Sequence, residues 1–187
     1  MNPLQSDERK GFYTLDDLEA LPENQRAELI DGEIFLMASP TPEHQDLVGE
    51  LHAEIRDYLK GKKAGCRAYI APLTVYLDAK QTNRHSVEPD IFVLCDPDKK
   101  KKDGIYGAPD WVIEVLSPST ASKDRLLKAY WYEVFGVKEY WIVDPFNAEV
   151  LVYLFSSGSR GKTYSFHDVI TPSLYPDLNI KITDLLP

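Results

Sequence analysis

The stretch Trp111-Val112-Ile113-Glu114-Val115-Leu116 decides how this chain must fold. Its β-branched and aromatic residues run on without polar alternation, which is typical of a strand buried on both faces. Glu114 stands in the middle of this run. An ionised carboxylate removed from water costs several kcal/mol unless a hydrogen bond, a cation or a metal compensates it. The sequence therefore predicts a partner for Glu114 inside the fold.

Further strands and helices are predicted on both sides of this run. Strand candidates lie at residues 68–77, 89–95, 139–143, 150–155, 163–166 and 178–182. Helix candidates lie at residues 15–21 and 43–60, and a third begins near 119–122 and ends at Gly136. The third has an expected apolar stripe of Leu127, Tyr130, Trp131 and Val134. Asp31-Gly32 between two apolar segments predicts a tight hairpin over residues 27–37.

The order of these elements predicts an α/β (α+β) fold, with a mixed central β-sheet flanked by α-helices and additional antiparallel strands. The chain has 187 residues and no internal repeat or long linker. We therefore expect one domain over residues 1–187.

Composition predicts a cytoplasmic protein without a membrane partner. No stretch reaches the ~18 apolar residues of a membrane span, and the first residues do not have the order of a signal peptide. Cys66 and Cys95 form no CxxC pair, so we expect two small core residues in a reducing compartment. The formal net charge of -9 opposes nucleic-acid binding, although lysines cluster locally at residues 60–63 and 99–102.

Asp90, Glu114 and Lys128 are the candidate catalytic residues. Alternation along neighbouring strands can point Asp90 and Glu114 at one site, and Lys128 on the following helix can reach it. Each residue also has a structural alternative. Asp90 can cap a turn, Lys128 can pair with Asp124, and the three can form a salt-bridged cluster without catalysis.

Two close carboxylates repel each other unless a divalent cation neutralises them, and hard oxygen ligands suit Mg2+ or Mn2+. Glu28, beside the hairpin, can extend this acidic site or be a partly exposed hairpin glutamate. His44, at the start of the first long helix, can hold a water or a phosphate, or can cap the helix or face solvent. The sequence thus predicts a metal-assisted hydrolytic site. It leaves undecided whether Glu28 and His44 belong to that site.

Three segments together resemble a known family. The segments are Pro89-Asp90, Val112-Ile113-Glu114-Val115-Leu116-Ser117-Pro118-Ser119-Thr120, and Gly136 to Pro145 after Lys128. They look like the putative restriction endonuclease family within the PD-(D/E)XK nuclease superfamily. The resemblance covers nearly the whole chain. It implies a restriction-endonuclease-like core and magnesium-dependent phosphodiester cleavage.

Residue by residue, the resemblance makes Asp90 the first acid and Glu114 the second, and it suggests the carbonyl of Val115 as a metal ligand. Leu116 stands where the superfamily pattern has a lysine. Lys128 on the following helix is similar to the migrated lysine of this branch.

The favoured hypothesis is a metal-dependent endonuclease that hydrolyses DNA by metal-activated water, working as a homodimer. The alternative is a catalytically silent module that binds nucleic acid or protein and keeps the nuclease fold. A carbohydrate hydrolase using Asp90 and Glu114 as an acid/base pair leaves Lys128 without a role. The target sequence, the choice between DNA and RNA and the biological role do not follow from the sequence.

Overall fold

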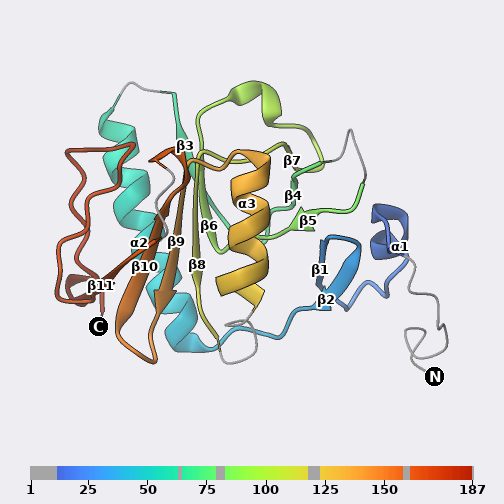
Figure 1. Cartoon of the computed structure of the whole chain (residues 1–187), viewed down its shortest axis with the longest axis horizontal. Coiled ribbons are helices and arrows are strands. Elements are labelled where there is room, and N and C mark those ends of the chain that lie inside the picture. The colour runs from blue at the N-terminus through green and yellow to red at the C-terminus, as the bar shows by residue number, and fades with distance from the viewer. Residues whose placement is uncertain (1–11, 63–64, 79–82, 118–122, 158–160, 187) are drawn as a thin grey trace.

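A computed structural model describes residues 12–62, 65–78, 83–117, 123–157 and 161–186, with the backbone alone for residues 123–125. In these ranges the strands form two β-sheets, and each sheet mixes parallel and antiparallel pairs (Figure 1). The larger sheet has the order β11-β10-β9-β8-β6-β3, and the smaller one has the order β2-β1-β5-β4-β7. This arrangement, with helices packed on the larger sheet, confirms the predicted mixed α+β fold.

The larger sheet is built around the buried run that contains Glu114. Its strands are β3 (Arg67–Ile70), β6 (Ile91–Leu94), β8 (Trp111–Val115), β9 (Glu139–Asp144), β10 (Glu149–Leu154) and β11 (Lys162–Ser165). Every residue of β8 is buried. β8 pairs antiparallel with β6 and parallel with β9, so polar groups on β6 and β8 can meet at one end of the sheet.

The smaller sheet contains the predicted hairpin. Its strands are β1 (Ala27–Ile30), β2 (Glu33–Leu36), β4 (Val75–Tyr76), β5 (Ser86–Val87) and β7 (Ile105–Tyr106). Asp31 and Gly32 connect β1 to β2 with φ values of 53° and 75°, which is the left-handed backbone that a tight hairpin turn requires. The hairpin prediction is therefore confirmed, and it carries Glu28 into the interior.

Two helices enclose the larger sheet. The helical elements are α1 (Leu15–Glu19), α2 (Pro42–Gly61), α3 (Ala129–Phe135), a π-helical turn η3 (Lys123–Lys128), and the 3-10 turns η2 (Pro97–Lys99), η4 (Phe155–Ser157) and η5 (Ile182–Asp184). In the part of the chain that the structure describes, none of the helices is long and apolar enough to cross a membrane.

The layering follows from the alternation of side chains along β8. Ile113 and Val115 join the apolar cluster that contains the buried face of α2, whereas Val112 and Leu116 join the cluster that contains residues of α3 and of the smaller sheet. Figure 1 shows α2 and α3 on either side of the larger sheet. Glu114 shares the parity of Val112 and Leu116 and so belongs to the α3 side. The long helix α2 forms as predicted, with Thr41 capping its first turn.

Two of the strand predictions are wrong. The segment 68–77 is not one strand but two, β3 in the larger sheet and β4 in the smaller one. Pro72 lies between them and has no N–H for a ladder, which ends the first strand and lets the chain cross to the other sheet. Residues 178–182 form an isolated bridge between Ile170 and Ile180, followed by the 3-10 turn η5.

The helix before Gly136 is rotated relative to the prediction. Its expected apolar stripe included Tyr130 and Val134, but both are exposed, and Lys128, Ala129 and Tyr132 face the interior instead. The helix ends at Phe135 as predicted, with Gly136 in the left-handed conformation at φ 88°. The predicted start at residues 119–122 lies outside the described residues.

The expectation for the two cysteines is also wrong. Cys66 and Cys95 form a disulfide and are partly buried beside the α2 cluster. Strands β3 and β6 pair with Arg67 opposite Leu94, so the residues just beyond this pair stand opposite each other. The disulfide removes the cysteine-based argument for a reducing compartment.

Candidate functional site

Asp90 and Glu114 meet through the register of β6 and β8. Ile91 is opposite Ile113, so the next position outward places Asp90 opposite Glu114. The backbone N–H of Asp90 donates to Glu114 Oε2 at 3.2 Å, and the backbone N–H of Val115 donates to Asp90 Oδ2 at 2.9 Å. Each carboxylate therefore accepts a backbone hydrogen bond from the strand that carries the other acid.

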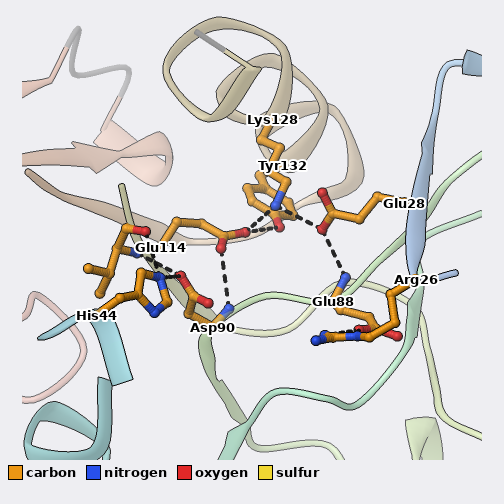
Figure 2. A network of polar contacts seen from close by, with 9 residues as sticks. Arg26, Glu28, His44, Glu88, Asp90, Glu114, Lys128 and Tyr132 are labelled. Atoms are coloured by element: carbon orange, nitrogen blue, oxygen red, sulfur yellow. Dashed lines mark hydrogen bonds and ion pairs between the residues drawn. The ribbon is translucent and has the colours of Figure 1, made fainter. Parts of the chain in front are cut away.

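Lys128 bridges two buried carboxylates. Its Nζ lies 2.6 Å from Glu114 Oε1 and 2.9 Å from Glu28 Oε1 (Figure 2). Only 3% of Lys128, 4% of Glu114 and 0% of Glu28 is exposed to solvent. Charges this deeply buried are tolerated because each carboxylate faces the shared ammonium and accepts further hydrogen bonds.

Two donors complete the surroundings of these carboxylates. The Tyr132 hydroxyl donates to Glu114 Oε1 at 3.1 Å, and the backbone N–H of Glu88 donates to Glu28 Oε1 at 3.0 Å. Tyr132 follows Lys128 by four residues, so both side chains leave the same face of the helix. Glu28 on the hairpin strand β1 and Glu114 on the central strand β8 thus hold the ammonium between them (Figure 2).

His44 reaches the same end of β8 from helix α2. Its Nε2 lies 3.0 Å from the carbonyl oxygen of Val115 and 3.3 Å from Asp90 Oδ2 (Figure 2). The side chain is mostly buried, at 12% exposure. The imidazole therefore belongs to the acidic cluster, and the expectations of a helix cap or a solvent-facing histidine do not hold.

A cavity of about 470 Å³ opens onto the cluster. His44, Asp90, Glu114, Val115 and Lys128 are among its lining residues. Arg26 and Glu88 also line it, and the guanidinium of Arg26 is paired with the Glu88 carboxylate, with Nε at 3.2 Å (Figure 2). This size and mixed lining suit a bound small group or a segment of a larger ligand.

Comparison of the sequence with other proteins assigns the chain to a family. The model of the Uma2 family, described as "Putative restriction endonuclease", matches residues 14–183. The chain belongs to the Uma2 family. An uncharacterized protein of Synechocystis sp., slr1290, is 27% identical over 132 residues, which are 70% of this chain and 67% of that protein.

A solved structure shares the fold. The crystal structure of a putative nuclease belonging to DUF820 from Anabaena variabilis matches with a TM-score of 0.75 and 26% sequence identity, over 92% of this chain and 96% of that one. Together with membership of Uma2, this likeness supports a nuclease function and a nucleic-acid substrate.

The donor set of this Uma2 protein fits one divalent cation, although the side chains are not arranged as a preformed site. Among the described residues, no group of three or more His, Cys, Asp or Glu side chains is placed to hold a metal. Two carboxylates and one backbone carbonyl do not require such a group. Of the lining residues that the structure describes, four carry carboxylates and two are permanent cations, an excess of negative charge that a divalent ion would balance.

The structure brings together all six residues that the sequence singled out: Glu28, His44, Asp90, Glu114, Val115 and Lys128. Their chemical roles stay predictions. Glu28 is fully buried, which excludes the alternative of a partly exposed hairpin glutamate. The side chain of Asp124, the alternative partner of Lys128, lies outside the described residues.

Three contributors were missed. Tyr132 donates to Glu114, and its only sequence signal is the spacing of four residues from Lys128. Arg26 and Glu88 lie next to Glu28 and Asp90 in space, but no spacing in the sequence pairs a residue before β1 with one after β5.

Proposed function

We propose that this Uma2 protein is a metal-dependent endonuclease that hydrolyses phosphodiester bonds of DNA. The observation that carries the proposal is the convergence of Asp90, Glu114 and Lys128 on one cavity, with the two acids linked by reciprocal backbone hydrogen bonds. Two acids and an ammonium beside an open cavity have the chemical makeup of a hydrolytic site for phosphate esters.

Asp90, Glu114 and the carbonyl of Val115 would hold Mg2+ or Mn2+. Such an ion would supply Lewis acidity, which polarises phosphoryl oxygens and makes water a better nucleophile at neutral pH. The protein contributes the orientation of its ligands. The N–H of Val115 fixes Asp90 Oδ2, while Lys128 and Tyr132 fix Glu114 Oε1, so Glu114 cannot rotate without losing hydrogen bonds.

Lys128 would place a positive charge beside the reacting phosphate. Its ammonium lines the cavity and can stabilise negative charge that develops on the phosphoryl oxygens during attack. Glu28 holds this ammonium from the side opposite Glu114. Glu28 is thus a positioning residue, because it acts on the phosphate only through Lys128.

Arg26 would contact the DNA backbone at the mouth of the cavity. The overall charge of -9 repels DNA, so binding needs local cations near the acids. The Arg26 side chain is 44% exposed, and its guanidinium is paired with Glu88, which also lines the cavity. A phosphate oxygen can bind its remaining N–H groups.

Cleavage of supercoiled plasmid tests the proposal. The wild-type protein should nick the plasmid in Mg2+ or Mn2+ and not in EDTA, and Glu114→Gln should abolish nicking. Asp110→Asn is the matched control, because Asp110 precedes the same strand and pairs with Lys138 at 2.6 Å, away from the cavity-lining residues. Binding of DNA without any metal-dependent cleavage would instead favour the silent binding module.

We also propose that the working form is a homodimer, which would bring two sites to the two DNA strands. Leu126, Tyr130 and Val134 are exposed and recur every four residues along η3 and α3. A second copy could cover this apolar stripe. Sedimentation equilibrium should give twice the chain mass, and Tyr130→Glu should shift it toward the monomer; a monomeric wild-type protein would contradict this part of the proposal.

A further inference from the structure

His44 occupies an unusual position among the proposed metal ligands. Its Nε2 lies 3.0 Å from the Val115 carbonyl oxygen and 3.3 Å from Asp90 Oδ2, which are both oxygens that the proposed function assigns to the cation. His44 comes from α2, on the face of the sheet opposite the helix that carries Lys128. The imidazole is thus brought to the oxygen ligands independently of the Glu28, Glu114 and Lys128 group.

We propose that His44 is a nitrogen ligand of the divalent cation, and that the site therefore prefers a first-row transition ion over Mg2+. This inference rests on the proposed function, because it assumes that Asp90 and Val115 hold the cation. Imidazole nitrogen binds transition ions well, whereas Mg2+ favours oxygen ligands and water. A site of carboxylates and one imidazole would therefore bind a first-row transition ion more tightly than Mg2+.

The spacing of the donor atoms suits this role. In an octahedral complex with bonds of about 2.1 Å, neighbouring donor atoms lie about 3.0 Å apart. The two measured distances from His44 Nε2 are close to that spacing. Among the described residues these side chains do not form a ready metal group, so the ligands must shift to contact one cation. In the absence of metal, the same distances allow Nε2–H to donate to the Val115 carbonyl.

Ligation requires the lone pair of Nε2 to face the cation. A metal-bound Nε2 carries no proton, so the proton of the neutral imidazole resides on Nδ1 in the metal complex. The carbonyl of Val115 then gives its oxygen lone pair to the cation instead of accepting the hydrogen bond. The carbonyl thereby exchanges a hydrogen-bond donor for the cation.

The backbone that carries His44 is well anchored. Thr41 caps the helix by accepting from the backbone N–H of His44, and Pro42 begins the first turn. One turn further on, Leu47 and Val48 are buried in the core. This fixed helix start limits the imidazole to the neighbourhood of Asp90 and Val115.

Pulsed EPR of bound Mn2+ tests the inference directly. The wild-type protein with one equivalent of Mn2+ should show a nitrogen modulation that changes when the histidines are labelled with 15N. In His44→Gln the modulation should disappear, although the Gln amide can still donate to the Val115 carbonyl. His52→Gln is the matched control, because His52 lies on the same helix with its Nε2 3.5 Å from the carbonyl of Ala68, and it should keep the signal.

Equilibrium binding supplies the second measurement. The affinity of His44→Gln for Mn2+ should fall by about tenfold or more, while its affinity for Mg2+ should change by less than about threefold. Circular dichroism should show an unchanged fold in both variants.

The outcomes separate the two proposals. Bound Mn2+ without nitrogen modulation, or equal losses for Mn2+ and Mg2+ in His44→Gln, would overturn the role of His44 while the metal-dependent nuclease stands. A wild-type protein that binds neither ion would overturn both proposals.

Discussion

Replacing Lys128 with methionine leaves the Glu28 and Glu114 carboxylates facing each other in the protein interior. In the wild-type protein, Glu28 Oε1 and Glu114 Oε1 both lie within 2.9 Å of Lys128 Nζ. At a separation of roughly 5 Å and an effective dielectric constant of about 20, two like charges repel by about 3 kcal/mol. Removing one member of a buried ion pair costs about 3–5 kcal/mol in other proteins. We therefore expect Lys128→Met to lower the free energy of unfolding by about 3–5 kcal/mol.

Urea unfolding at pH 7 and low ionic strength measures this loss. Lys138→Met is the control, because Lys138 also lies 2.6 Å from a carboxylate, that of Asp110, but 54% of its side chain is exposed. Such an exposed pair should contribute about 1 kcal/mol or less. Lys128→Met should also regain stability relative to wild type as the pH falls, because protonation of either carboxylate removes the repulsion. Equal losses in the two variants would refute the reasoning.

Three further substitutions test other parts of the structure. Glu28→Gln keeps the acceptor for the backbone N–H of Glu88 but removes a charge partner of Lys128; we expect thermal unfolding to show a loss of about 1–3 kcal/mol, and an unchanged melting temperature would contradict it. Gly136→Ala forces alanine into a left-handed conformation at φ 88° and should cost about 1–2 kcal/mol in urea unfolding, whereas Gly49→Ala inside α2 should stabilise the protein. Burial lowers the pKa of His85 below its usual 6.5, although the charge of Asp78 opposes the shift. Below pH 6.5 the unfolded state therefore binds more protons than the folded state, so wild-type stability should decline as the pH falls from 6.5 toward the lowered pKa. His85→Gln should show a smaller decline in calorimetry.

The acids of the site could be predicted from the sequence because they depend on local rules. Glu114 interrupts an apolar strand, and Asp90 opens the neighbouring strand, so antiparallel pairing alone brings them together. The Asp31-Gly32 hairpin and the helix from Pro42 also follow from short-range signals. These signals were enough for the fold class.

Other features depend on contacts between distant segments and could not be predicted. Lys128 is buried although the expected apolar stripe of its helix does not include it. Its burial depends on Glu28, which lies on a hairpin a hundred residues earlier and provides the second carboxylate. The two cysteines form a disulfide only because β3 pairs with β6. The sequence makes His44 a candidate, but its contacts with the Val115 carbonyl and Asp90 come from the packing of α2 on the sheet, which no spacing in the sequence encodes.

A crystal of the protein soaked in Mn2+, with its anomalous difference map, tests the central claim most directly. We predict one strong peak per chain, in contact with the carboxylates of Asp90 and Glu114 and with the carbonyl of Val115. A peak at another place, or none near these residues at saturating Mn2+, would contradict the assignment of this cavity as the site of a metal-dependent nuclease.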